Sequence, residues 1–241
     1  MTATFPRILP CGDAALVFEF GDTVDDAVNA KVLALDAAIA RAAIPSLIET
    51  VPTYRSLLVH YDPLAIDFAT MSARLWPLAE NLQAATGRRR CWRIPVVYGG
   101  EFGIDLEAVA KRHGISPDEV VRIHTSGQYY VAMLGFMPGF AYLAGLDARI
   151  ATPRRDEPRT MTPAGTISIG GVQAGVQCLA APSGWNLLGR TPVRTYHPQR
   201  DPVFLIEPGD AIAFYAIDES RWHDLDLAAA EGKPVAELAP A

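Results

Sequence analysis

Three arginines lie close together in a segment that also contains two prolines: Arg154, Arg155 and Arg159. A guanidinium group is planar, permanently charged and rich in N–H donors, so several of them on one stiff loop suit a carboxylate or a phosphate. Asp156 and Glu157 lie between the arginines and offer the alternative that the loop neutralises its own charge. From the residues alone, both interpretations stay open.

Aromatic residues and glycines mix densely on both sides of this loop. Phe136 and Pro138 belong to the segment Gly-Phe-Met-Pro-Gly-Phe at residues 135–140, and Trp185 follows a glycine. Such side chains can line an apolar groove, while packing in the core is the alternative for the phenylalanines. Arg190, between a glycine and a Thr-Pro pair, is a further candidate for binding an anion.

His124 is a candidate general base, because the pKa of an unperturbed imidazole lies near neutral pH. It shares a predicted helical face with Val120 and Ile123, so a buried histidine held by a hydrogen bond is the alternative. Ser183 lacks the Gly-x-Ser-x-Gly surroundings of a nucleophile elbow, and the histidines show no metal-binding spacing. The glycine-rich segment 170–175 is typical of a β-turn rather than of a phosphate loop. We therefore expect no bound metal and no nucleotide motif.

The composition predicts a chain with a substantial core and an acidic balance. Of its 241 residues, 50% are hydrophobic and 20% are charged, with a net charge of -6 at pH 7. The negative charge argues against nucleic acid as a partner. Three widely spaced cysteines form no disulfide framework or zinc motif, which favours a reducing cytoplasm. We expect no signal peptide and no membrane contact, since no apolar run approaches the roughly 20 residues of a membrane span.

The elements that must position these residues fall into two groups. Residues 1–87 are predicted to form a small α+β domain in the order β-β-α-β-β-α. Apolar alternation predicts strands over residues 5–10, 14–20, 47–52 and 56–61. Helical spacing predicts one helix over 24–43, capped by Thr23, and a second after Asp67. Pro77 is expected to kink or split the second helix.

Residues 91–219 are predicted to be mostly β, as a barrel or a sandwich, because short apolar runs alternate with Gly and Pro turns. Asp105 and Ser116 are expected to cap two short helices. The strands are expected over residues 92–98, 129–134, 166–169, 172–178, 203–206 and 211–217. Residues 220–241 form a tail whose end is expected to fray. The basic segment 86–90 is the predicted linker, with a nucleic-acid contact as the alternative to a solvated hinge.

Five ordered segments resemble the B-type subunit of the bacterial ATP-dependent 5-oxoprolinase. This family also contains the KipI-type inhibitors of a sporulation histidine kinase, and it is also labelled allophanate hydrolase subunit 1. The segments are residues 135–143, 153–159, 163–166, 169–171 and 184–192. The likeness continues back through residues 95–100 and the Ser116 helix to Gly-Asp-Ala-Ala-Leu at 12–16, and so covers nearly the whole chain.

The resemblance implies an α+β N-terminal domain followed by a cyclophilin-like β-barrel domain. It also implies a cytoplasmic hetero-oligomer in which a C-type (KipA-like) subunit is the partner and an A-type subunit completes the reaction. ATP, with Mg²⁺, would be bound together with the partner subunit. The substrate would be 5-oxoproline, which is phosphorylated before its ring opens to glutamate.

The resemblance also suggests roles for single residues. His124, Arg154, Arg155 and Arg159 are the candidate catalytic residues, as acid/base or as groups that stabilise anions. The candidate substrate-binding residues are Phe136, Pro138, Gln173, Trp185 and Arg190. Departures from the family pattern at residues 174–178 and 181–183 bear on the substrate. An allophanate- or urea-type ATP-dependent enzyme and a KipI-like kinase inhibitor therefore stay open as alternatives.

Overall fold

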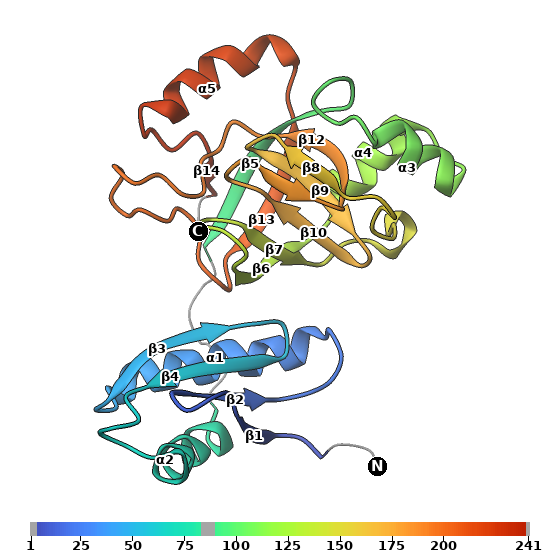
Figure 1. The fold of residues 1–241 in the computed structure, drawn as a ribbon. Helices are drawn as coiled ribbons and strands as arrows, with labels where there is room; N and C mark the ends of the chain where they lie inside the picture. Colours follow the sequence, from blue (N-terminus) through green and yellow to red (C-terminus); the bar gives the residue numbers. More distant parts are fainter. Residues whose placement is uncertain (1–3, 83–89, 240–241) are drawn as a thin grey trace. The chain divides into compact units, whose positions relative to one another are not determined.

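The computed structural model describes residues 4–82 and 90–239, and it divides the chain into two compact units, residues 1–87 and 88–241. Figure 1 shows both units as ribbons. Each unit has its own hydrophobic core, which is what an independent domain requires. The predicted linker, residues 86–90, lies outside the described residues except for Arg90.

The N-terminal unit is a four-stranded antiparallel sheet with two helices, in the predicted order. Its elements are β1 (Arg7–Pro10), β2 (Ala15–Glu19), α1 (Asp26–Ala42), β3 (Leu47–Pro52), β4 (Ser56–Tyr61) and α2 (Phe68–Glu80). The sheet order is β1-β2-β4-β3. Leu16 pairs with Val59 and Phe18 with Leu57, and all four side chains are fully buried on one face. Both helices add buried residues to the same core, so they cover that face together.

Polar residues determine where these two helices begin. α2 follows Asp67 as predicted, and the Asp67 side chain caps it by accepting a backbone hydrogen bond in its first turn. α1 is capped by Asp25 in the same way, so the prediction of Thr23 was wrong by two residues. Pro77 does not split α2, because it lies on the exposed side of the helix, where solvent can replace the missing backbone hydrogen bond.

The C-terminal unit is built around a barrel of seven strands. These are β5 (Cys91–Tyr98), β6 (Tyr129–Leu134), β7 (Ala141–Ala144), β9 (Thr166–Gly170), β10 (Gln173–Val176), β12 (Asn186–Arg190) and β13 (Ala211–Ala216). Their order is β12-β9-β10-β7-β6-β13-β5, and β12 pairs back onto β5, which closes the ring. Closure leaves no unpaired edge among these strands, and their inward side chains, such as Ile94, Ile167 and Leu143, are fully buried.

Further elements surround the barrel. The helices are α3 (Leu106–His113), α4 (Pro117–Ser126), η1 (Ala148–Ile150), η2 (Glu219–Arg221) and α5 (Trp222–Ala230). A separate two-stranded ribbon, β8 (Arg159–Thr162) with β11 (Ala181–Ser183), lies beside the barrel strands in Figure 1. The short strand β14 (Glu237–Leu238) pairs with β5. The predicted tail, residues 220–241, thus contributes a helix and a strand to this unit, and its last two residues, where fraying was expected, lie outside the described residues.

Two predictions for this unit were wrong. Residues 203–206 form no strand, and Phe204 makes only an isolated bridge to Tyr196, because prolines at 202 and 208 limit regular pairing. Asp105 precedes α3 but makes no side-chain capping bond, whereas Ser116 caps α4 as predicted. Strands β7, β8, β11 and β12 were not predicted, because their residues lie in motifs rich in Gly and Pro that hide apolar alternation.

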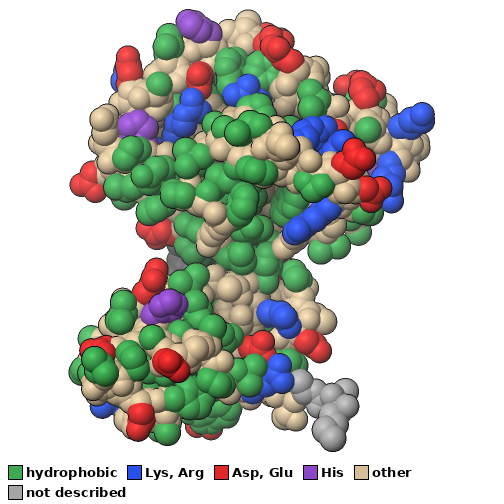
Figure 2. Space-filling view, viewed as in Figure 1, with side chains coloured by type: hydrophobic (Ala, Val, Ile, Leu, Met, Phe, Trp, Pro, Cys, Tyr) green, Lys and Arg blue, Asp and Glu red, His purple; other side chains and the backbone are tan. Residues whose placement is uncertain are grey.

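Figure 2 shows hydrophobic side chains gathered on the face of the barrel unit where β8 to β10 lie in Figure 1, with basic side chains around them. Met161 in β8, and Val172 and Leu179, which lie before and after β10 in the chain, are between 40% and 62% exposed. An apolar face of this kind is a candidate binding surface.

Candidate functional site

The arginine loop, residues 153–159, is fixed through its backbone. The Pro153 carbonyl accepts a hydrogen bond from the Asn186 side chain at 2.9 Å. The Arg155 amide donates to the Gly184 carbonyl at 2.7 Å, and the last residue of the loop begins β8, which pairs with β11. The stiffness predicted from the prolines is thus reinforced at three points along the loop.

A buried carboxylate holds two of the three arginines. Asp105, which is 4% exposed, accepts from the two terminal nitrogens of Arg159 at 2.9 and 2.7 Å and from Arg155 at 3.3 Å. It also accepts from the Leu187 amide at 2.8 Å. These bonds compensate for taking the charge out of water. They also occupy both carboxylate oxygens, which is why Asp105 does not cap α3.

Four aromatic rings form one wall of a cavity beside the loop. The ring of Phe140 lies 4.6 Å from that of Tyr142 and 5.8 Å from that of Phe136, measured between centroids. Trp185 meets Phe140 and Tyr142 nearly edge-on at 6.2 and 6.0 Å. Such distances are typical of favourable aromatic contacts. Trp185 is only 6% exposed, so it is a buried part of the wall.

Trp185 fits into this wall because two glycines lie under its ring. A Cβ atom at Gly170 would come within 2.7 Å of the indole, and one at Gly175 would come within 3.1 Å. The segment 170–175 forms the β9–β10 hairpin, in which Gln173 pairs with Gly170. The predicted β-turn is thus confirmed, and its glycines also make room for the tryptophan.

The cavity has a volume of about 260 Å³ and arginines at its edge. The guanidinium carbon of Arg154 lies 5.6 Å from the centroid of the Trp185 ring, within the range of a cation–π contact. The lining residues are Phe136, Phe140, Tyr142, Arg154, Arg155, Pro158, Gln177, Pro182, Ser183, Gly184 and Trp185. An apolar wall facing guanidinium groups suits a small ligand that has both a hydrophobic face and an anionic group.

Gln177 is a cavity residue that sequence reasoning missed. It is 1% exposed, and its amide nitrogen donates to the Leu179 carbonyl at 2.8 Å and to the Thr162 hydroxyl at 2.9 Å. These bonds fix the orientation of the amide. A single glutamine in a strand carries no motif, so no sequence signal distinguished it from Gln173, which does not line the cavity.

The loop and its surroundings carry excess positive charge. Of the three guanidinium groups, those of Arg155 and Arg159 share one buried carboxylate, Asp105, and Arg154 forms no ion pair with the described residues. Asp156 and Glu157 are exposed and form no ion pair within the described chain either, so internal neutralisation by these two residues is not observed. Burial raises the pKa of Tyr142, which keeps its hydroxyl protonated at neutral pH. An anionic ligand would offset the remaining charge.

The rim of the cavity contains a strained residue. Phe136 has a φ of 68° and is 67% exposed. This left-handed conformation is unusual for an aromatic residue and is found mainly where function or tight packing requires it. Pro138, two residues further on, is exposed and does not line the cavity. Of the two predicted loop residues, the structure therefore brings only Phe136 to the site.

Arg190 lies in a different cavity, of about 340 Å³. Its guanidinium carbon lies 4.8 Å from the Trp222 ring centroid and 5.8 Å from that of Phe102, and its Nε donates to the Ala164 carbonyl at 3.2 Å. Burial lowers the pKa of Arg190. The other residues that line this cavity are Glu101, Glu219 and His223. The structure thus separates Arg190 from the arginine loop.

His124 lies in the core of the barrel unit and lines none of these cavities. Its side chain is fully buried, its Nδ1 is 2.8 Å from the Tyr98 hydroxyl, and its ring stacks on Phe214 at 4.8 Å. Burial lowers the pKa of His124 to about 3, so the imidazole is neutral. This position corresponds to the buried-histidine alternative and is inaccessible to a ligand in the arginine cavity.

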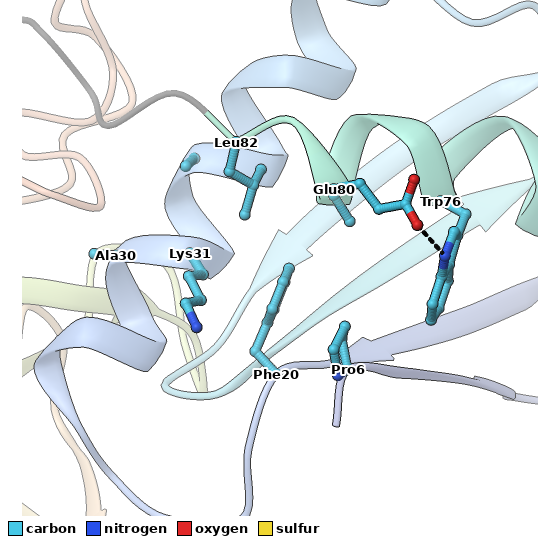
Figure 3. A pocket seen from close by; sticks show the side chains of 9 residues that line it. Pro6, Phe20, Ala30, Lys31, Trp76, Glu80 and Leu82 are labelled. Atoms are coloured by element: carbon cyan, nitrogen blue, oxygen red, sulfur yellow. Dashed lines mark hydrogen bonds between the residues drawn. The ribbon is translucent and has the colours of Figure 1, made fainter. Parts of the chain in front are cut away.

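The N-terminal unit contains a cavity of another kind, with a volume of about 540 Å³ (Figure 3). Figure 3 shows Pro6 and Phe20 around it and the Trp76 indole, which donates to Glu80 at 3.0 Å. Apart from Glu80 and Lys31, its lining is uncharged. This cavity offers mainly apolar surface, and the Glu80 carboxylate in it already accepts from the Trp76 indole.

Across residues 4–82 and 90–239, no three His, Cys, Asp or Glu side chains gather in a way that would hold a metal ion. No helix in the same residues is long and apolar enough to cross a membrane. All three cysteines are free, and only Cys11 is exposed.

Comparison with known proteins shows the family. The family described as "Carboxyltransferase domain, subdomain C and D" matches residues 6–206. A protein of Bacillus subtilis (strain 168), named as the B-type subunit of 5-oxoprolinase, is 41% identical over 231 residues, which cover 90% of this chain and 95% of that protein. The chain belongs to the family of B-type 5-oxoprolinase subunits.

Solved structures relate this member of the 5-oxoprolinase subunit family to longer proteins. A crystal structure of TTHA0988 matches with a TM-score of 0.76 and 36% identity over 85% of this chain, which spans only 40% of that longer chain. The K. lactis urea amidolyase matches with a TM-score of 0.80 over 96% of this chain and 16% of its own. At 20% identity, this second likeness shows a shared fold alone.

Proposed function

We propose that this chain is the B-type subunit of an ATP-dependent 5-oxoprolinase. The observation that carries the proposal is the 41% identity over 95% of the length of a protein with that name. The word subunit implies that the activity needs partner chains, and we propose a C-type subunit as the first partner and an A-type subunit as the second. The closed barrel agrees with the cyclophilin-like type and the free cysteines with the cytoplasm, and both assignments stay predictions.

The arginine cavity supports 5-oxoproline as its ligand. This molecule is a flat five-membered lactam with one carboxylate. The rings of Phe140 and Trp185 offer an apolar wall for the lactam, while Arg154 and Arg155 offer guanidinium donors for the carboxylate. A volume of about 260 Å³ is slightly smaller than the roughly 300–1,000 Å³ typical of drug-sized ligands, which suits a molecule of this size.

ATP is proposed to bind together with the partner subunit. The glycine-rich segment 170–175 is a hairpin, and no phosphate loop leading into a helix occurs in the described chain. The arginine cavity is small and is already suited to the lactam. The residues of this chain therefore do not by themselves fit a complete nucleotide site, and we assign ATP and Mg²⁺ to a site that the C-type subunit completes.

In the proposed reaction, phosphorylation activates the stable lactam amide of 5-oxoproline toward attack by water. The γ-phosphoryl group leaves ADP and forms a new O–P bond to the lactam oxygen, which activates the ring carbon. Water then adds to that carbon, and the ring C–N bond breaks as the nitrogen takes up a proton, which leaves the γ-carboxyl group as an acyl phosphate. A second water hydrolyses this acyl phosphate to give glutamate and phosphate. Arg154 and Arg155 would hold the substrate and offset negative charge, which is the main task in phosphoryl transfer.

Two residues lose the catalytic roles that the resemblance suggested. His124 is buried and neutral in the core, so we propose no proton transfer through it. Both terminal nitrogens of Arg159 bind Asp105, so we propose that Arg159 supports the site without contacting the substrate. The catalytic arginines of the proposal are therefore Arg154 and Arg155.

The test is ATP hydrolysis by the chain co-expressed with its cognate C-type subunit. 5-Oxoproline, allophanate and urea are assayed in parallel, with each subunit alone as a control. We expect ADP release that depends on 5-oxoproline and on both chains. If ADP release depended on urea or allophanate instead, that compound would take the place of 5-oxoproline as the proposed substrate. Full activity of this chain alone would contradict a site shared between two subunits. No turnover with any amide, together with inhibition of a histidine kinase, would support the KipI-like alternative.

A further inference from the structure

Asp105 divides its contacts with the two arginines unequally. It receives two short hydrogen bonds from Arg159, at 2.9 and 2.7 Å, and one longer bond from Arg155, at 3.3 Å. Arg155 lines the cavity and Arg159 does not. The arginine that is held less tightly is therefore the one that a ligand can reach.

Arg155 keeps most of its donors available for that ligand. A guanidinium group carries five N–H donors, and one terminal nitrogen of Arg155 is engaged by Asp105. The Arg155 backbone is itself fixed by its bond to Gly184. The side chain is thus held at both ends, with its Nε and second terminal nitrogen unbonded within the described chain.

Asp105 is rigid enough to serve as the fixed point. Its backbone amide donates to the Leu187 carbonyl at 3.1 Å, and its carboxylate accepts from the Leu187 amide at 2.8 Å. Leu187 belongs to β12, a strand of the closed barrel. The carboxylate is therefore tied to a strand of the closed barrel.

We propose that Asp105 is a positioning residue for substrate recognition. It holds Arg155 so that the free donors of that guanidinium bind the carboxylate of the ligand, while Arg159 supplies the second positive charge that keeps Asp105 stable in its buried place. The inference rests on the proposed function in taking 5-oxoproline as the ligand. It adds a specificity role to a residue that touches no substrate.

Replacing Asp105 by Asn separates positioning from charge, because the two effects have opposite signs. Removing the buried negative charge makes the cavity more positive, which alone would strengthen the binding of a carboxylate. Asn also places an amide donor against guanidinium and backbone donors, so Arg155 loses its fixed orientation. If Asp105 acts mainly by positioning, D105N weakens the binding of 5-oxoproline. If it acts only through charge, D105N strengthens that binding.

Asp210 provides a matched control in the same unit. It is 5% exposed, accepts two hydrogen bonds from Arg90 at 2.8 and 2.6 Å, and accepts one from the Trp92 indole at 3.1 Å. Neither Asp210 nor Arg90 lines the arginine cavity. D210N therefore breaks a buried Asp–Arg pair of similar geometry without touching the proposed site.

The experiment measures binding to the assembly with its C-type subunit by titration calorimetry, without ATP. The probes are 5-oxoproline and 2-pyrrolidinone, the same lactam without the carboxylate, and melting temperatures are recorded for each variant. We expect D105N to raise the Kd of 5-oxoproline at least tenfold and to leave the Kd of 2-pyrrolidinone within about twofold. D210N should lower the melting temperature to a similar degree while changing neither Kd.

Three results would overturn the inference. D105N could bind 5-oxoproline as tightly as the unaltered protein or more tightly, it could weaken both lactams equally, or D210N could give the same selective loss. Each of these leaves the proposed function intact as long as the unaltered assembly prefers 5-oxoproline to 2-pyrrolidinone. An unaltered assembly that binds neither lactam would overturn the proposed function, and the inference with it.

Discussion

The arginine cavity and the cavity at Arg190 both combine arginine with aromatic rings, and they differ in how the arginine is held. In the arginine cavity, a pinned loop and a buried Asp105 carboxylate hold Arg155. In the second cavity, Arg190 lies over Trp222 and has no ion-pair partner among the described residues. The first arrangement fixes the direction of a guanidinium group, while the second mainly buries its flat face.

The difference shows that an arginine next to a tryptophan is weak evidence for a binding site on its own. A fixed direction matters because the energy of a charge-assisted hydrogen bond depends on its geometry. A stacked guanidinium is worth about 0.5–1 kcal/mol at an exposed site and has no comparable requirement for direction. We therefore expect substitutions in the first cavity to affect function and those in the second to affect only local stability.

The largest effect is expected for Arg155. Arg155→Lys keeps the charge but loses the planar fork, so activity of the complete assembly should fall by roughly 10² to 10³, the range for losing one transition-state donor. The measurement is 5-oxoproline-dependent ATP hydrolysis. Arg190→Lys is the control and should stay within about threefold of the unaltered assembly. Equal losses for the two variants would remove the distinction between the cavities.

A substitution at Gly170, against which Trp185 packs, is expected to give the next largest effect. Gly170→Ala places a methyl group within 2.7 Å of the indole, so overpacking should cost about 1–3 kcal/mol of the free energy of unfolding and should raise the KM for 5-oxoproline. Gly135→Ala is the control, since its Cβ would meet only the end of Met133 at 3.9 Å. Denaturant unfolding and KM measurements test this. An unchanged KM for Gly170→Ala would remove Trp185 from the binding wall.

His124 should affect stability through pH. Burial lowers its pKa to about 3 in the folded protein, while the unfolded value lies near 6.5, so the unfolded chain binds the extra proton between these values. Stability is therefore lost as the pH falls below about 6.5. Between pH 7 and pH 5 the unaltered protein should lose about 2 kcal/mol more than His124→Gln. The titratable neighbours Tyr98 and Tyr129 stay protonated in this range. If the stability of the unaltered protein and that of His124→Gln changed with pH in parallel, this would contradict the buried, neutral state of His124.

The smallest effect is expected for the second cavity. Arg190→Met keeps a flexible apolar side chain over the rings of Trp222 and Phe102 and removes the cation–π contacts, so it should cost about 1 kcal/mol or less in stability. Substrate affinity of the assembly should not change. A tenfold rise in the KM for 5-oxoproline would instead place Arg190 in the substrate site.

The residues that carry local signals could be predicted from the sequence. A stiff arginine loop around Arg154 and Arg155 and an aromatic groove that includes Trp185 were expected. Pro, Gly and aromatic residues have strong local preferences that make such features visible in a sequence. The strands of the N-terminal unit were expected for the same reason, through their alternation. The family resemblance that these motifs suggested is confirmed by the identity to B-type 5-oxoprolinase subunits.

Contacts between distant parts of the chain could not be predicted. Asp105 lies 50 residues before Arg155, and an aspartate directly before a helix favours a cap, so its pairing with the arginines gave no local signal. Arg190 was grouped with Trp185 because they are near in sequence. An extended five-residue strand separates them by about 17 Å, which is why they reach different cavities.

A crystal structure of the assembly with its C-type subunit and 5-oxoproline would compare the two cavities directly. We expect the lactam against Phe140 and Trp185, with its carboxylate within hydrogen-bonding distance of the Arg155 guanidinium, which should remain bonded to Asp105. The second cavity at Arg190 should hold no lactam. Density for 5-oxoproline at Arg190, or only at residues of the partner subunit, would contradict the assignment of the arginine cavity as the substrate site.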